Sequence, residues 1–356
     1  MSSEGRFPYT YSMSRAPTPT RVRLADVAEV AGVSMKTVSN VVHDYPHISP
    51  KVRDKVQAAI DALGYRPNIT ARRLATGLTG MVALAIPWID HPYFAELSRH
   101  MAEEAARNGY RVLVEQTANS VEAEQAVLRD REQGVVDGVI FHPVRLGTVD
   151  ITKLQPNIPL VLLGESAIPL TTDHVMIDNV LAAREAVEML IAQGRRRIAF
   201  LATISDDVTG STQLRLVGYQ EALINAGLPL DPGLVLSSDG WSVDNAADGL
   251  SAALRAGIAI DAVLCRDDTF AMGALAALAK AGRSVPQDVA VLGWDDTILA
   301  RYSTPPLSTV APDKLAIAAI AMRMLDERIH GYVGIGRHEI AAHSIIQAAT
   351  TSALAG

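Results

Sequence analysis

The sequence contains only one cysteine, Cys265, so an internal disulfide bond is excluded. A single thiol without further ligands at metal-binding spacing predicts no metal site, and we expect it to be a buried structural thiol. No apolar run approaches the ~18 residues of a membrane span. The first twenty residues include Glu4 and lack the apolar core of a signal peptide. We therefore expect a cytoplasmic protein with a disordered leader at residues 1–20.

The sequence also lacks the common catalytic signatures. It has no G-x-S-x-G elbow, no G-x-x-x-x-G-K-[ST] phosphate loop, no H-E-x-x-H zinc helix and no Cys/His cluster. We therefore expect no enzymatic activity, no cofactor and no metal. Asp90, His91 and Asp178 could form an acid/base set, so an enzyme stays open as an alternative.

Charge is distributed unevenly over a chain long enough for more than one domain. The whole sequence has 356 residues, 49% of them hydrophobic, and a net charge of −7. Residues 1–80 contain 11 Lys and Arg against 6 Asp and Glu, a net charge of +5. The remainder contains 32 − 11 = 21 against 39 − 6 = 33, a net charge of −12. Only the first part is therefore suited to meet phosphate groups.

Residues 24–42 predict two short helices joined by a tight turn. Apolar residues repeat at helical spacing in both, with Leu24, Val27 and Ala28 in the first and Val38, Val41 and Val42 in the second. Gly32 tolerates the positive φ of the turn, and Ser34 is placed to cap a second helix that begins at Met35. The second helix presents polar groups outward, which suits phosphates and base edges: Met35, Lys36, Thr37, Ser39 and Asn40.

Two further helices are predicted after this pair. Residues 49–63 begin with Ser49 and Pro50 as N-cap and first-turn proline, and their apolar face would close a three-helix core. Residues 68–77 form a short helix candidate with Arg72, Arg73 and Leu74, too short to be stable alone.

These pieces in this order resemble the headpiece and hinge of the LacI/GalR family of bacterial transcription repressors. The matching segments are Asp26-Val27-Ala28, Ala31-Gly32-Val33-Ser34, Thr37-Val38-Ser39, the helix from Ser49, Gly64-Tyr65-Arg66-Pro67-Asn68 and Ala71-Arg72-Arg73-Leu74. The resemblance implies that Met35, Lys36 and Asn40 read bases in the major groove. It also implies that Leu74 of paired hinge helices inserts into the minor groove. The expected DNA-binding residues are Ser34, Met35, Lys36, Thr37, Ser39, Asn40, Arg72 and Leu74.

From Met81 onward, short apolar strands alternate with amphipathic helices, which predicts a parallel α/β body. The expected strands are residues 81–86, 111–115, 138–141, 160–163, 198–202, 262–265 and 289–293. The clearest helices are residues 94–108, 120–133 and 181–193. This pattern predicts two doubly wound sheets, whose ligands collect at the carboxyl ends of the strands and in the cleft between the two lobes.

Aromatic residues, carboxylates and an arginine follow these strands. The family resemblance extends over about residues 22–351 and implies a periplasmic-binding-protein-like effector domain. Matched position by position, the expected effector-binding residues are Tyr93, Phe94, Asp178, Arg215, Asp267, Trp294 and Asp295. The expected connections between the lobes lie near residues 193–197, 310–314 and 337–343.

Several positions depart from the family pattern. His91 and Asp267 stand where asparagine is usual, Trp294 where Phe or Tyr is usual, and Ala348 where an arginine often lies. An ionised Asp267 accepts hydrogen bonds without donating, which favours a hydroxyl-rich or cationic ligand. We therefore expect a sugar as effector, with Trp294 as a possible stacking platform. A nucleoside, or a phosphoprotein that docks on the N-terminal lobe, stays open.

The expected domains are a leader at 1–20, a helix-turn-helix headpiece at 21–66, a hinge helix or linker at 67–80 and an effector-binding and dimerisation domain at 81–356. Because the chain shows no C-terminal leucine heptad, we expect a homodimer on a near-palindromic operator. The effector would shift operator affinity in either direction. A transporter's solute-binding protein would share the two-lobed body, but it would need an export signal and would not use residues 22–77.

Overall fold

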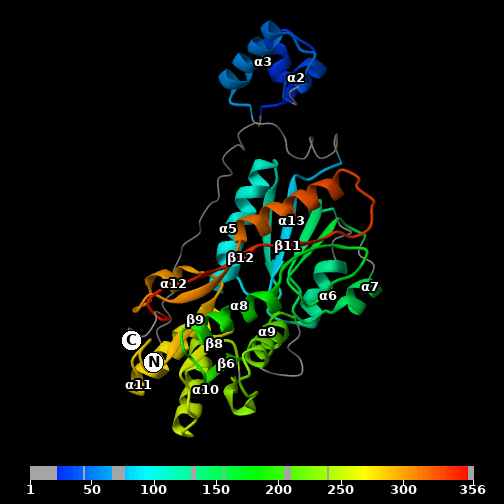
Figure 1. The fold of residues 1–356 in the computed structure, drawn as a ribbon. Helices are drawn as coiled ribbons and strands as arrows, with labels where there is room; N and C mark the ends of the chain where they lie inside the picture. The colour runs from blue at the N-terminus through cyan, green and yellow to red at the C-terminus, as the bar shows by residue number, and fades with distance from the viewer. Residues whose placement is uncertain are drawn as a thin grey trace, which may run out of the picture. The chain divides into compact units, whose positions relative to one another are not determined.

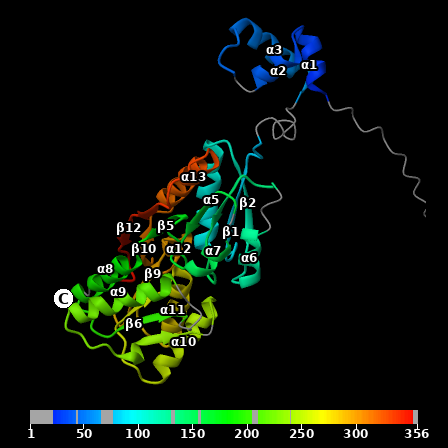
Figure 2. The same cartoon turned by 90° about the vertical axis from the view of Figure 1, so that its right-hand side faces the viewer.

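The computed structural model describes residues 22–42, 45–65, 77–129, 134–154, 157–203, 210–238 and 240–351. The chain forms two compact units, Met1–Gly77 and Leu78–Gly356 (Figures 1 and 2). The predicted hinge residues Arg72 and Leu74 lie outside the described ranges.

The first unit contains the three predicted headpiece helices, α1 (Leu24–Ala31), α2 (Met35–Val42) and α3 (Pro50–Leu63). Gly32 ends α1 with φ 59°, in the left-handed region that glycine adopts without strain. The Ser34 hydroxyl accepts a hydrogen bond of 3.1 Å from the backbone N–H of Thr37, which caps α2 as expected. A shared core joins the helices around buried Val27, Val38 and Val56, which confirms the predicted apolar faces.

The second unit consists of two lobes, each built on a six-stranded sheet. The N-terminal lobe has the strand order β11-β5-β4-β3-β1-β2. Its strands are β1 (Met81–Ile86), β2 (Arg111–Gln116), β3 (Gly138–Phe141), β4 (Leu160–Leu163), β5 (Asp173–Ile177) and β11 (His338–Ala341). Its helices are α5 (Pro92–Arg107), α6 (Val121–Arg129), α7 (Thr148–Leu154) and α13 (Lys314–Ile329). Alternate residues of β1 face opposite cores: Val82 and Leu84 pack with α5 and α13, and Ala83 and Ala85 pack with α6 and α7.

The C-terminal lobe repeats this design with the strand order β12-β10-β9-β8-β6-β7. Its strands are β6 (Ile198–Ala202), β7 (Val235–Ser237), β8 (Ala262–Cys265), β9 (Ala290–Trp294), β10 (Ser308–Pro312) and β12 (His343–Ile346). Its helices are α8 (Asn179–Ala192), α9 (Ser211–Asn225), α10 (Val243–Arg255), α11 (Asp268–Lys280) and α12 (Ile298–Tyr302), with a 3-10 turn at Pro232–Leu234. Apart from the antiparallel β10–β12 pair, the paired strands of both sheets are parallel. The described residues therefore form the predicted two-sheet α/β body.

Three connections link the lobes. The chain leaves β5 and enters α8, which packs on α9 and touches β8 and β12, so the first connection lies at Ile177–Asn179. The expectation of residues 193–197 was wrong, because α8 belongs to the C-terminal lobe and those residues follow it. The second runs from β10 to α13 through Asp313, and the third from β11 to β12 through Ala342. None of the described helices is long and apolar enough to cross a membrane.

Candidate functional site

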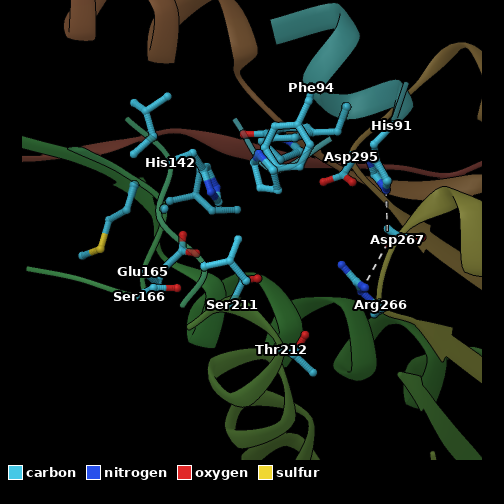
Figure 3. A pocket seen from close by; sticks show the side chains of 18 of the residues that line it. His91, Phe94, His142, Glu165, Ser166, Ser211, Thr212, Arg266, Asp267 and Asp295 are labelled. Atoms are coloured by element: carbon cyan, nitrogen blue, oxygen red, sulfur yellow. Dashed lines mark ion pairs between the residues drawn. The ribbon is translucent and has the colours of Figure 1, made fainter. Parts of the chain in front are cut away.

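A cavity lies where the carboxyl ends of both sheets face each other (Figure 3). It encloses about 870 Å³ of empty space, including the part open to solvent. The N-terminal lobe lines it with Pro87, Trp88, His91, Tyr93, Phe94, His142, Val144, Leu163, Gly164, Glu165, Ser166, Val175, Met176 and Ile177. Helix α13 of the same lobe adds Ile317, and the C-terminal lobe adds Ser211, Thr212, Arg215, Trp241, Arg266, Asp267, Asp295 and Pro312. Five of the seven sequence-predicted effector residues are therefore brought together: Tyr93, Phe94, Arg215, Asp267 and Asp295.

Asp178 and Trp294 do not line the cavity. The Asp178 carboxylate caps α8 by accepting a hydrogen bond of 2.9 Å from the N–H of Leu181. Trp294 is fully buried at the end of β9, and the guanidinium carbon of Arg215 lies 3.9 Å from its ring centroid. The tryptophan is therefore covered by the arginine, and the expectation that it offers a stacking surface to a ligand is wrong.

Arg215 belongs to a hydrogen-bond chain that joins the two lobes. Its Nε donates to Oδ1 of Asn179 at 2.8 Å, and Nδ2 of Asn179 donates to Oε1 of Glu165 at 2.7 Å. Nη1 of Arg215 also donates to the carbonyl oxygen of Arg266. Burial raises the pKa of Glu165 to about 7, although Arg215 and the Asn179 hydrogen bond favour the charged form. The Glu165 carboxyl can therefore accept or donate a hydrogen bond near neutral pH.

Asp295 extends from the end of β9 with φ 99°, an uncommon conformation for a residue other than glycine. Lys314 holds this backbone in place, because its Nζ donates to the carbonyl oxygens of Asp295 at 2.5 Å and Asp296 at 2.9 Å. The same Nζ lies 2.8 Å from a carboxylate oxygen of Glu96 on α5. Burial raises the pKa of Asp295, and the neighbouring Arg215 opposes that rise. The backbone at Asp295 in the C-terminal lobe is thus held by Lys314 of the N-terminal lobe, and its carboxyl group lines the cavity.

Aromatic rings line much of the remaining wall. The rings of Trp88 and Trp241, which come from different lobes, have centroids 5.0 Å apart and are tilted by 42°. Phe94 meets His142 edge-on, with centroids 5.0 Å apart. Burial lowers the pKa of His142 to about 4, so its ring is neutral at physiological pH. The cavity therefore offers apolar ring faces beside carboxyl groups and guanidinium groups.

Several lining residues were not among the sequence-predicted site residues, namely Trp88, His91, His142, Glu165, Trp241 and Arg266. Trp88 and His91 lie between the end of β1 and the start of α5, and Arg266 directly precedes the predicted Asp267. Glu165 is the second residue after the end of β4, so its position near a strand end was a usable signal. Trp241 lies between β7 and α10, and β7 has only three residues, which left no strand pattern to mark its end.

A second candidate interface is the exposed face of α2 in the headpiece. Ser34, Met35 and Lys36 are exposed, and Thr37, Ser39 and Asn40 are partly exposed, while Val38 and Val41 are buried beneath them. This face combines one lysine with several small hydrogen-bonding side chains. Within the described ranges, no group of three or more His, Cys, Asp and Glu side chains is arranged to hold a metal ion.

The architecture defines a class of protein, in which a helix-turn-helix unit accompanies a two-lobed α/β body with a cavity between its lobes. Two family models match the chain. One describes bacterial regulatory proteins of the lacI family and covers residues 23–68. The other describes a periplasmic binding protein-like domain and covers residues 187–351.

Individual relatives extend this match over most of the chain. The catabolite control protein A of Priestia megaterium is 31% identical over 306 residues, which cover 85% of this chain and 91% of that protein. The HTH-type transcriptional repressor CytR of Escherichia coli K12 is 30% identical over 333 residues, which cover 93% and 97%. The chain belongs to the LacI family of bacterial DNA-binding transcription regulators.

Solved structures agree with this assignment. A lac repressor dimer bound to operator and the anti-inducer ONPF is 27% identical and matches with a TM-score of 0.81, covering 93% of this chain and 99% of that one. A LacI-family regulator from Sanguibacter keddieii is 37% identical with a TM-score of 0.71, covering 77% and 98%. The regulator CelR in complex with cellobiose is 28% identical with a TM-score of 0.69, covering 93% and 100%.

Proposed function

We propose that this chain represses transcription from a near-palindromic operator, and that a sugar bound between its two lobes changes its affinity for that DNA. The observation that carries the proposal is the cavity itself. It lies at the carboxyl ends of both parallel sheets, where ligands of such folds bind, and it takes residues from both lobes. A ligand that contacts both lobes stabilises one arrangement of them over another, which is what an allosteric effector requires.

The lining chemistry supports a polyhydroxylated ligand. Carboxyl groups of Glu165 and Asp295 can accept hydrogen bonds from hydroxyl pairs, and the rings of Trp88 and Trp241 can pack against the C–H face of a sugar. The relative CelR was solved with cellobiose, which shows that this fold accommodates a sugar in one family member. A nucleoside is the competing ligand, since aromatic rings also stack on flat bases.

The DNA contacts that we propose come from α2. Lys36 would meet phosphate or a base edge, with Met35, Thr37, Ser39, Asn40 and Ser34 around it, because these residues are exposed or partly exposed. The N-terminus of α2, capped at Ser34, carries the positive end of the helix dipole, which favours a nearby phosphate. Arg72 and Leu74 complete the proposed set.

We further propose that the working form is a homodimer. The related lac repressor was solved as an operator-bound dimer.

The function is tested by a thermal-shift screen of the purified full chain against cellobiose, other sugars, polyols and nucleosides, followed by an operator gel shift with any hit. We expect a sugar to raise the melting temperature by binding the folded state. The matched control is Asp295→Asn, which should abolish the shift. We choose it over Arg215→Ala, because Arg215 also covers Trp294.

Three outcomes contradict the proposed ligand. If only nucleosides raised the melting temperature, the effector would be a nucleoside and not a sugar. A sugar hit that Asp295→Asn leaves unchanged would move the site elsewhere. No hit at all would favour a phosphoprotein partner as the signal. An inducer would weaken operator binding in the gel shift, whereas a corepressor would strengthen it.

A further inference from the structure

The turn that carries the cavity residue Asp295 is held by charged side chains of the other lobe. This turn leads from β9 into α12, two elements of the C-terminal lobe. Its backbone is unusual, because Asp295 and Asp296 have φ angles of 99° and 46° although neither is glycine. Such conformations persist only where the surrounding structure holds them. The contacts of this turn therefore decide how Asp295 is presented to the cavity (Figure 3).

Lys314 and Glu96 supply the contacts from the N-terminal lobe. Lys314 is the first residue of α13 and Glu96 lies on α5, and these two helices lie side by side (Figures 1 and 2). Besides its hydrogen bonds to two carbonyl oxygens of the turn, Nζ of Lys314 forms an ion pair of 2.8 Å with Oε2 of Glu96. The other carboxylate oxygen, Oε1, accepts a hydrogen bond of 2.8 Å from the backbone N–H of Ile298, the first residue of α12. The ion pair thus binds three backbone groups of the C-terminal lobe.

This ion pair is largely enclosed. Only 9% of the Lys314 side chain and 19% of the Glu96 side chain are exposed. A charge in such surroundings is costly unless it is paired and hydrogen-bonded. If the turn moved away from α5 and α13, the ammonium group and the backbone groups of the turn would lose their partners together. The turn and the N-terminal lobe should therefore move as one.

The C-terminal lobe holds the same turn through Asp268. Oδ2 of Asp268, at the start of α11, accepts hydrogen bonds from the backbone N–H of Thr297 at 2.7 Å and from its hydroxyl at 2.9 Å. The backbone N–H of Asp295 donates to the carbonyl oxygen of Val310 on β10 at 2.7 Å. The turn is therefore attached to both lobes at once.

We propose that Lys314 and Glu96 form a clasp that fixes the arrangement of the two lobes at the turn carrying Asp295, and that they are positioning residues for the effector site. The three connections between the lobes are single chain segments, and backbone rotation within such segments allows hinge motion. Lys314 directly follows the second connection at Asp313, so the clasp restrains this motion close to its origin.

This inference rests on the proposed function in one respect, because it makes Asp295 the point at which a bound effector acts on the arrangement of the lobes. A ligand contact that favours one position of the turn also favours the matching position of α5 and α13.

The test measures the arrangement of the lobes in the full chain without any ligand, so its result is independent of the effector's identity. Spin labels are placed on cysteines introduced at Val149 of α7 and Ile224 of α9, which are 62% and 60% exposed. Native Cys265 is buried and should stay unlabelled. Dilution with excess unlabelled protein restricts the measured distances to pairs within one chain. Pulsed electron paramagnetic resonance then gives the distance distribution between the lobes.

Three variants are compared with the parent: Lys314→Met, Glu96→Ala and Glu96→Gln. Lys314→Met keeps an apolar stem and removes the ammonium group, whereas Glu96→Ala removes the acceptor of the Ile298 N–H. We expect both to broaden the distribution and to shift its mean. Glu96→Gln should shift it less, since its amide oxygen can still accept the hydrogen bond from Ile298.

The matched control is Arg323→Met on the same helix as Lys314. Arg323 pairs with Glu339 of β11 at 2.6 Å, and both residues belong to the N-terminal lobe. Loss of this pair should leave the distribution unchanged. If Lys314→Met does not fold, Glu96→Ala still tests the clasp, because Glu96 is the less buried partner.

The proposal is overturned if the folded variants Lys314→Met and Glu96→Ala keep the parental distribution, or if Arg323→Met changes it as much as they do. Equal shifts in Glu96→Ala and Glu96→Gln would also contradict it, because the hydrogen bond to α12 would then not matter. A ligand screen without a hit would leave these distances unaffected. Failure of the clasp and failure of the proposed effector are thus distinguishable.

Discussion

At the scale of single residues, the cavity gathers ionisable groups whose environments differ sharply. Asp267 is surrounded by Arg266 and His91 and stays charged, whereas Glu165 is buried with less compensation and has a pKa of about 7. The sequence indicated which residue types follow the strands, but it could not show how they pair. The guanidinium of Arg215 lies on Trp294, so a residue predicted to face a ligand faces an arginine instead.

Glu165 gives a prediction for stability against pH. Its folded pKa is raised from 4.5 to about 7, so the folded chain keeps a proton that the unfolded chain releases between these values. The free energy of unfolding should therefore fall as pH rises through that window and level off above it. Glu165→Gln cannot titrate and should lack this contribution. The free energy of unfolding of the variant minus that of the parent should therefore increase by ~1–2 kcal/mol from pH 5 to pH 8. This figure already includes a reduction for the solvent that reaches the cavity.

Chemical denaturation of both proteins at the two pH values measures this difference. Other titrating groups, including buried Asp268, are present in both proteins and cancel in the comparison. A stability difference that stays the same at pH 5 and pH 8 would show that Glu165 does not titrate in this range.

At the scale of elements, helices pack in pairs through glycine. A Cβ at Gly218 of α9 would lie 2.2 Å from the carbonyl oxygen of Val180 on α8. A Cβ at Gly273 of α11 would lie 2.4 Å from the carbonyl oxygen of Val243 on α10. Backbone cannot yield as a flexible side chain can, so both sites exclude any larger residue. In the C-terminal lobe, a glycine thus allows two helix backbones to come close together in two places, between α8 and α9 and between α10 and α11.

Gly218→Ala should therefore destabilise the chain by ~1–3 kcal/mol through overpacking. It should also weaken effector binding, because α9 carries Arg215 one turn earlier. Gly249→Ala in α10 is the control, since its Cβ would find its nearest neighbour at 3.4 Å, an ordinary contact. Urea denaturation compares the two. Equal stability of Gly218→Ala and Gly249→Ala would contradict the packing argument.

Elements with strong patterns were predictable, and those without were not. Apolar runs bounded by polar segments gave β1, β3, β4, β6 and β8 with the observed bounds. The edge strands β7, β11 and β12 were missed because they are short and partly exposed, so no continuous apolar run marks them. Strands β5 and β10 were missed as well, because each begins with two polar residues. The first connection between lobes was misplaced, because a sequence does not show which sheet a helix will cover.

At the scale of the whole molecule, the two units carry net charges of opposite sign. Residues 1–80, which include the headpiece, carry net +5 and the remainder net −12, by the arithmetic of 11 against 6 and 21 against 33 charged residues. Operator affinity should therefore decrease as salt rises, through the headpiece. The effector that we propose would act on the other unit, where it would shift the population of lobe arrangements.

The most direct test of this division is a titration of operator DNA with the parent, Lys36→Ala and Asp295→Asn, each with and without the sugar identified by the thermal-shift screen. Lys36→Ala should lose ~5-fold to ~150-fold in operator affinity, in line with the loss of a base or phosphate contact, and keep its thermal response to the sugar. Asp295→Asn should bind the operator as the parent does and lose its response to the sugar. If both variants lost both functions while remaining folded, the proposed separation of DNA reading from effector sensing would be wrong.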